Sequence, residues 1–152
     1  MLNWVFKPFS ELSLTELYSI MRLRQEVFIV EQNCPYLDAD GKDLKSYHLM
    51  GYAGDELVAY SRIVKPGVSY DEVSIGRVVS STQHRGLAYG RQLMAESIRQ
   101  IEKLFGQVPI RIGAQQYLQK FYESFGFVRE GETYLEDGIP HIIMRRDEAN
   151  EK

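Results

Sequence analysis

Residues 72–91 read EVSIGRVVSSTQHRGLAYGR, and this stretch decides the fold that the sequence predicts. Its β-branched residues favour a strand over residues 72–80, and a helix of roughly eighteen residues is expected to start near Ala88. The apolar residues at helical spacing in that helix are Leu93, Met94, Ile98, Ile101 and Leu104. The stretch therefore predicts a strand, a short loop and a long helix in direct succession.

The loop between this strand and this helix has the features of an anion-binding site. A helix N-terminus exposes unpaired amide N–H groups at the positive end of the helix dipole. Gly86 and Gly90 allow a phosphate to approach the backbone, and Arg85 and Arg91 can add charge-assisted hydrogen bonds. The loop is not a P-loop, because no Gly-Lys-Ser/Thr follows, and it lacks the G-x-G-x-x-G of a dinucleotide fold.

The remaining sequence predicts an α/β chain with a mixed sheet covered by helices, in a single domain of residues 1–152. Ser13 and Glu16 form a capping-box pattern that marks the start of the first helix. Gly76 lies inside a predicted strand, which indicates a bulge or a close backbone approach. Further strands are expected over residues 4–9, 48–53, 56–65, 108–113, 127–135 and 139–146, a helix over 115–125, and a long loop over 33–47.

Charge and composition argue against several classes of function. The formal net charge of -3 gives no electrostatic reason to bind nucleic acid or an anionic membrane. The chain starts without the pattern of a signal peptide and has no apolar run of about 20 residues, so we expect a cytoplasmic protein. Cys34 is the only cysteine, and Leu49 stands where a calcium loop needs glutamate, so no metal site is expected.

Three arginines occupy positions where a charged side chain needs a partner. Arg24 falls in the apolar face of the first helix, and Glu31, seven residues on, would share that face. The pair is either a buried brace or a polar wall of a substrate pocket. Arg62 and Arg77 lie inside predicted strands, where they either pair with the carboxylates of the 33–47 loop or hold an acidic group of a substrate.

Several motifs in the sequence resemble those of the GNAT family of N-acetyltransferases. Residues 83–88, QHRGLA, match the family's pyrophosphate motif, and Arg85-x-x-Ala88-x-Gly90 fits the helix register better, with Ala88 in place of a glycine. Residues 121–127, FYESFGF, match a second family signature. Residues 23–36, LRQEVFIVEQNCPY, and 136–141, EDGIPH, are similar to the ElaA-like branch of these acetyltransferases.

The resemblance implies the GNAT acyl-CoA N-acyltransferase fold, with a central, mostly antiparallel, twisted sheet of about seven strands. Helices cover both faces, and strands 4 and 5 splay apart. It also implies acetyl-CoA as the acyl donor. The backbone of Val78, Val79 and Ser80 would bind the pantetheine arm, and Gln115 stands where relatives contact CoA. The pyrophosphate would be held by Arg85, Gly86, Leu87, Ala88, Tyr89, Gly90 and Arg91.

The same resemblance assigns Tyr122 as the phenol that hydrogen-bonds or protonates the departing CoA thiolate. Candidates for the acceptor side are Arg24, Glu31, Arg62, Arg77 and His141. The general base stays open among Glu31, Asp43, His48, Glu72 and His141.

The predicted activity is transfer of an acetyl group from acetyl-CoA to a primary amine, by direct attack in a ternary complex. A small-molecule amine is favoured over a protein or peptide lysine, because carboxylates in a lid over residues 33–47 would attract a cationic amine. The alternative is a non-catalytic acyl-CoA sensor module. The sequence is also compatible with a homodimer.

Overall fold

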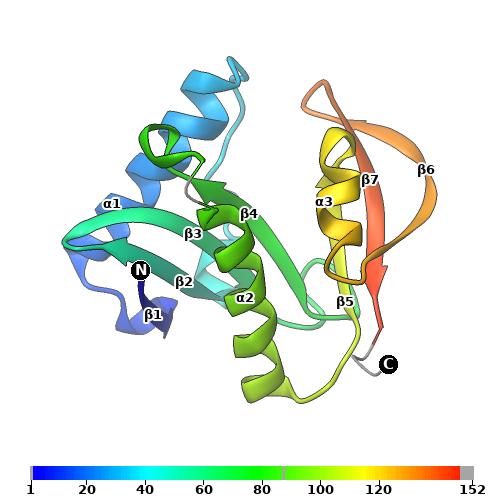
Figure 1. Cartoon of the computed structure of the whole chain (residues 1–152), viewed down its shortest axis with the longest axis horizontal. Helices are drawn as coiled ribbons and strands as arrows, with labels where there is room; N and C mark the ends of the chain where they lie inside the picture. Colours follow the sequence, from blue (N-terminus) through cyan, green and yellow to red (C-terminus); the bar gives the residue numbers. More distant parts are fainter. Residues whose placement is uncertain (1, 87, 148–152) are drawn as a thin grey trace.

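The computed structural model of the chain describes residues 2–86 and 88–147, and it contains seven strands in two sheets (Figure 1). The first sheet has the order β1-β2-β3-β4, and the second has the order β5-β7-β6. The strands are β1 Asn3–Pro8, β2 Ser46–Ala53, β3 Glu56–Val64, β4 Ser74–Ser80, β5 Ile110–Gln115, β6 Val128–Glu136 and β7 Ile139–Arg146. Neighbours within each sheet are antiparallel, as the predicted fold class requires.

Within residues 2–86 and 88–147, one backbone bridge joins the two sheets, at one end of β4 and β5. Val73 and Ile110 form an isolated parallel bridge, and the amide of Arg111 donates to the carbonyl of Val73 at 3.1 Å. Beyond that bridge the two strands belong to different sheets, and Figure 1 shows them diverging. The predicted splay of the fourth and fifth strands is confirmed.

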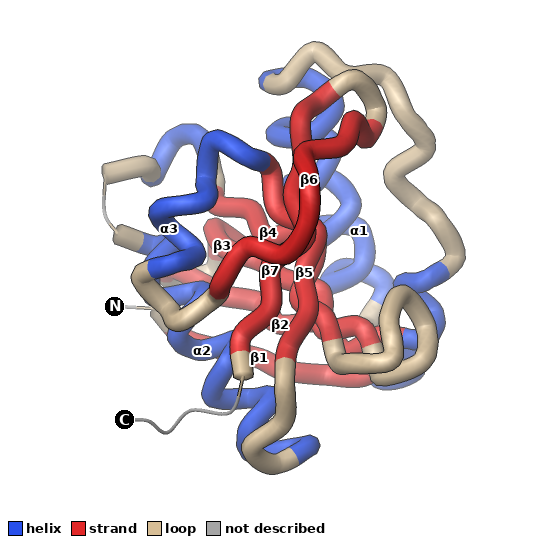
Figure 2. The backbone as a smooth tube through the Cα atoms, turned by 90° about the vertical axis from the view of Figure 1, so that its right-hand side faces the viewer, coloured by secondary structure: helices blue, strands red, loops and turns tan. Residues whose placement is uncertain are grey.

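Helices cover both faces of the strands, with α1 Leu14–Arg24 on one side and α2 Tyr89–Phe105 on the other (Figure 2). The α1 side packs Ile20 and Leu23 against Tyr60. The α2 side packs Met94, Ile98 and Ile101 into the larger core cluster, which joins both sheets. This shared core packs against both sheets. Beyond the Val73–Ile110 bridge, no ladder of hydrogen bonds joins the described residues of β4 and β5.

The first helix begins as the sequence predicts and continues in an unexpected form. Ser13 and Glu16 make the reciprocal capping-box hydrogen bonds. After Arg24 the chain continues as a π-helix over Gln25–Glu31, with hydrogen bonds such as Gln32 N–H to the Val27 carbonyl. Wider turns rotate the following side chains away from the face that an α-helix would give them.

Strand β4 carries the bulge that Gly76 indicates. The pairing of β3 with β4 is irregular between Tyr60 and Arg62, so that Arg62 pairs with Gly76 and Tyr60 with Val79. The left-handed residue of the bulge is Arg77, with φ of 50°, and not the glycine before it. A non-glycine residue in this conformation inside a strand is strained, and it redirects the arginine side chain.

The predicted helix over 115–125 is shorter and divided. A 3-10 turn at Gln116–Leu118 leads into α3, Gln119–Glu123. The long loop also contains a 3-10 turn, Lys42–Lys45, directly before β2. None of the helices in the described ranges is long and apolar enough to cross a membrane.

Candidate active site

A cavity of about 1020 Å³ occupies the gap that the divergence of β4 and β5 opens. Ile75, Gly76 and the 77–80 segment line one wall, and Ile112, Gly113 and Gln115 line the other. β4 and β5 are both edge strands of their sheets, so their facing edges carry main-chain N–H and C=O groups without a strand partner. An extended ligand with amide groups can pair with such an edge as an added strand.

The residues predicted to bind the pantetheine arm lie along this cavity. Val78, Val79 and Ser80 line it at the C-terminal end of β4. Gln115 lines it at the end of β5, where its side-chain amide lies 3.4 Å from that of Gln32. The cavity is therefore lined by backbone groups from β4 on one wall and by a side-chain amide from β5 on the other.

The N-terminus of α2 closes one end of the cavity. Gln92 N–H donates to the Ala88 carbonyl at 3.1 Å as the first helical hydrogen bond, and no side chain caps the helix. No acceptor among the described residues contacts the amides of residues 89–91, and amides at this end of a helix can bind an anion. Ala88 has φ of 61°, a left-handed conformation that explains the glycine of the family motif.

Arg85 and Gly90 belong to the cavity lining at this end. Gly86, Ala88, Tyr89 and Arg91 lie in the same segment outside that lining, and Leu87 lies outside the described residues. Arg91 donates to the Ser124 hydroxyl at 3.1 Å and lies over the Phe125 ring, so its guanidinium is turned toward α3. Arg85 pairs with Glu31, with Nη2 2.9 Å from Oε1.

Replacing Gly90 with alanine is expected to weaken CoA binding by at least about tenfold without destabilising the fold. Beyond its chain neighbours and its own helix, a Cβ at Gly90 meets no atom of the described residues within 4 Å, so the methyl group would project into the space expected for a phosphate. Alanine is also the better helix former. Calorimetric titration with CoA measures the affinity, and the unfolding temperature is the internal control. Unchanged affinity would show that the phosphate does not lie against this helix end.

Tyr122 projects from α3 into the middle of the cavity wall. Its side chain is 6% exposed and packs edge-on against the rings of Phe121 and Phe127. Within the described chain, no group hydrogen-bonds to its hydroxyl, which leaves that hydroxyl available to a ligand. Burial, with a smaller contribution from Tyr117, raises the pKa of Tyr122, so the phenol stays protonated at neutral pH and can act as an acid.

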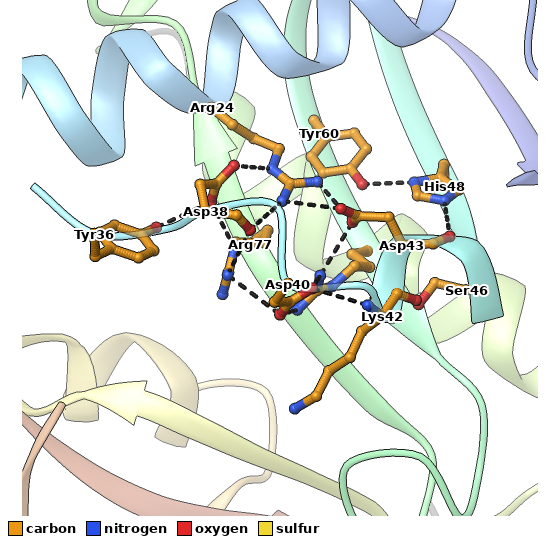
Figure 3. Close-up of polar contacts among 11 residues, drawn as sticks. Arg24, Tyr36, Asp38, Asp40, Lys42, Asp43, Ser46, His48, Tyr60 and Arg77 are labelled. Atoms are coloured by element: carbon orange, nitrogen blue, oxygen red, sulfur yellow. Dashed lines mark hydrogen bonds and ion pairs between the residues drawn. The ribbon is translucent and has the colours of Figure 1, made fainter. Parts of the chain in front are cut away.

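Three arginines and three aspartates form a network beside the cavity (Figure 3). Arg24 donates to Asp38 and Asp43, each at 2.8 Å. The other pairs are Arg62 with Asp40 and Asp43 and Arg77 with Asp38, at 2.8 to 3.0 Å, and Arg77 with Asp40 at 3.4 Å. The 33–47 loop is thereby fastened to α1, β3 and β4 through its carboxylates.

The network decides between the alternatives that the sequence left open for the three arginines. Arg62 and Arg77 pair with the loop carboxylates, and both also line the cavity. A brace between Arg24 and Glu31 is wrong, because Arg24 points to the aspartates while Glu31, after the π-helix, lines the cavity and pairs with Arg85. Arg24 itself is 0% exposed, and it holds the loop from behind the cavity lining.

The pKa of Asp40 reflects this pairing. Burial alone would raise its pKa, but hydrogen bonds and charge from Arg62, with smaller help from the Lys42 amide and Arg77, lower it to about 2. Asp40 is thus an anion throughout the neutral range and stays paired. The carboxylate acts as part of the wall and is a poor proton acceptor.

Four of the five candidate bases are occupied elsewhere. Glu72 pairs with Arg111 and Arg145, at 3.0 and 2.9 Å. Asp43 is held by Arg24 and Arg62. Glu31 is paired with Arg85, and His48 uses both ring nitrogens, at 2.6 Å from the Tyr60 hydroxyl and 3.0 Å from the Asp43 carbonyl.

His141 is the exception. It lines the cavity from β7, and its Nδ1 lies 2.7 Å from the Ile139 carbonyl oxygen. A carbonyl oxygen only accepts, so Nδ1 carries the proton and Nε2 of the neutral ring is an acceptor. The neighbouring Tyr134 ring, 5.9 Å away between centroids, helps to fix the imidazole.

Two contacts that sequence reasoning missed join the first half of the chain to its second half, one at the turn between β6 and β7 and one at the end of β5. The Cys34 thiol donates to the Asp137 carbonyl at 3.3 Å, and the side-chain amides of Gln32 and Gln115 lie 3.4 Å apart. Residues 30–36, VEQNCPY, and 136–141, EDGIPH, are both part of the similarity to the ElaA-like branch. That shared similarity was the only sequence signal that the two segments lie close together. Among the described residues no group of three or more His, Cys, Asp or Glu side chains is arranged to hold a metal.

Comparison with known proteins identifies the class that this fold and cavity define. The chain belongs to the GNAT acetyltransferase family, because its residues 26–148 match the acetyltransferase (GNAT) domain. Members of this family use acyl-CoA donors.

Two bacterial relatives define the branch. The chain is 47% identical to Protein ElaA of Escherichia coli K12 over 149 residues, 97% of each chain. The crystal structure of that ElaA matches with a TM-score of 0.90 at 46% identity, covering 97% of this chain and all of the other. An acyl-CoA N-acyltransferase from Pseudomonas aeruginosa matches with a TM-score of 0.91 at 45% identity, covering 96% and 99%. The predicted ElaA-like branch is confirmed.

Proposed function

We propose that this protein transfers the acetyl group of acetyl-CoA to a primary amine, by direct attack in a ternary complex. The observation that carries the proposal is one continuous cavity with Gly90 at an anion-binding helix end, the edge of β4 along its wall and Tyr122 in its lining. These are the places for the pyrophosphate, the pantetheine arm and the leaving sulfur of one extended donor.

The reaction needs a base, an oxyanion partner and an acid. His141 Nε2 takes a proton from the acceptor amine, and the amine nitrogen attacks the carbonyl carbon of the thioester. A main-chain N–H of the β4 edge stabilises the tetrahedral oxyanion. As the C–S bond breaks, Tyr122 gives its proton to the CoA thiolate, and the proton held by His141 returns to Tyr122 through solvent.

Replacing His141 with glutamine is expected to lower kcat/KM for the amine about 100-fold at neutral pH. A glutamine amide can still donate to the Ile139 carbonyl but has no basic nitrogen. Initial rates of thiol release with the amine concentration varied measure this loss. A variant that keeps the wild-type kcat/KM would require another base.

Two contacts across the cavity support a small acceptor. The Cys34 thiol bonds the Asp137 carbonyl between β6 and β7, and Gln32 contacts Gln115 at the end of β5, so side chains of the first half of the chain cross to the elements that would border a groove for a protein substrate. A lysine side chain on a folded protein would have to part them, whereas a small amine needs only the cavity.

The test is release of free CoA thiol from acetyl-CoA across a panel of polyamines, amino acids and lysine peptides, with the acetylated product identified by mass spectrometry. The proposal predicts release that depends on a small amine and yields the N-acetylated amine. Saturable CoA binding without release for any amine would support a non-catalytic acyl-CoA sensor instead.

A further inference from the structure

The acceptor end of the cavity has walls of opposite charge. One wall carries Arg77, Lys42 and Asp40, and the other carries Glu136, Asp137 and His141 from the hairpin of β6 and β7. The network of Figure 3 balances three arginines with three aspartates, so Lys42 leaves that side with an excess of positive charge. An acceptor with both a positive and a negative end fits such a field in one orientation.

Arg77 is held rigidly and still has an unused donor. Its Nε donates to Asp38 at 2.8 Å, and its Nη2 donates to the Asp38 carbonyl at 3.0 Å. The Tyr36 ring lies against the guanidinium, 5.6 Å from its centroid to Cζ. Nη2 also reaches Asp40 at 3.4 Å, whereas no acceptor of the described chain contacts Nη1.

Lys42 contributes a second free cation on the same side. Its side chain lines the cavity, and no carboxylate among the described residues pairs with its ammonium. Its backbone is fixed, because its amide donates to Asp40 and its carbonyl accepts from Ser46. The ammonium therefore extends from an anchored turn.

The backbone of Arg77 supports a role in binding. The residue adopts φ of 50° within a strand, at the bulge that interrupts the pairing with β3. Strain of this kind persists where the surrounding structure fixes it, and it occurs often at ligand sites. Here the bulge aims a guanidinium at the cavity and not along the sheet.

We infer that the acceptor amine carries a carboxylate, and that Arg77 Nη1 and Lys42 Nζ bind this carboxylate while the amine lies at His141. The inference deepens the proposed function by naming its substrate class, that of α-amino acids and related zwitterions. Arg62 has no comparable role, because Asp40 and Asp43 occupy both of its terminal nitrogens and only 4% of its side chain is exposed.

The test compares the common α-amino acids with their carboxamides, which keep the amine and lose the negative charge. For at least one amino acid, kcat/KM should exceed that of its amide by about tenfold or more, because charge-assisted bonds to two cations are lost in the amide. Lys42→Glu should remove this preference. Lys45→Glu is the matched control, because it makes the same charge change in the same 3-10 turn outside the cavity lining, and it should leave the preference intact.

Equal kcat/KM for acid and amide forms, or equal behaviour of the two lysine variants, would overturn the subsite and leave acetyl transfer standing. If no amine is acetylated, the proposed function fails, and calorimetric titration of the CoA-saturated protein with the same pairs decides the subsite alone. Binding of amino acids but not of amides, lost in Lys42→Glu, would support it. Absence of binding would overturn it.

Discussion

Replacing Tyr122 with phenylalanine is expected to lower kcat about 100-fold while acetyl-CoA affinity and the unfolding temperature stay near the wild-type values. The phenol makes no hydrogen bond within the described chain, so its removal leaves no protein donor or acceptor unpaired. The ring remains packed between Phe121 and Phe127. Only the proton for the leaving thiolate is lost, and positioned acids of this kind contribute roughly 100-fold or more.

The comparison uses thiol release under saturating acetyl-CoA and amine, with calorimetric CoA titration in parallel. Tyr18→Phe is the control, because Tyr18 is 70% exposed on α1 and outside the cavity lining. If Tyr122→Phe retained the wild-type kcat, the thiolate would leave without protonation by this residue, and the assignment of Tyr122 as the acid would be wrong.

Replacing Arg24 with leucine is expected to destabilise the protein by about 3 to 5 kcal/mol, the largest effect on stability that the structure implies for a single side chain. Arg24 is 0% exposed and bonds Asp38 and Asp43, which are 8% and 6% exposed. Without it, two buried carboxylates lose a charged partner. For a chain of this length the unfolding temperature should fall by roughly 10 °C.

Arg22→Leu is the matched control in the same helix. Arg22 pairs with Glu26 at 3.6 Å on the surface, where such pairs contribute about 1 kcal/mol or less. Thermal unfolding of the two variants should therefore differ clearly. Equal unfolding temperatures would mean that the network does not hold the 33–47 loop as described.

Local patterns predicted the elements that depend on local physics. Ser13 caps α1, the strands expected over residues 48–53 and 56–65 form β2 and β3, and Gly76 marks a bulge. Each of these signals arises from hydrogen bonds or backbone angles within a few residues. The family resemblance added the splay of β4 and β5, which no single segment encodes.

Local patterns could not predict which residues far apart in the sequence pair with Arg24. A helical wheel with a constant angle per residue placed Glu31 beside Arg24, but the π-helix after Arg24 changes that angle. The partners of Arg24 are aspartates 14 and 19 residues on, in a loop whose path depends on the finished fold. His141 could be chosen among the five candidate bases only after the hydrogen-bond and ion-pair partners of all five were known.

The central claim is that the acetyl group passes directly from acetyl-CoA to the amine inside the cavity. The competing mechanism is transfer through a cysteine of the same cavity. Cys34 also lines the cavity, and its thiol donates to the Asp137 carbonyl, so an acetyl-cysteine intermediate is the clear alternative. Initial rates with acetyl-CoA and the amine varied together separate the two mechanisms. The account predicts intersecting double-reciprocal lines and full activity in Cys34→Ser. Parallel lines, with acetyl trapped on Cys34 when the amine is omitted, would contradict it.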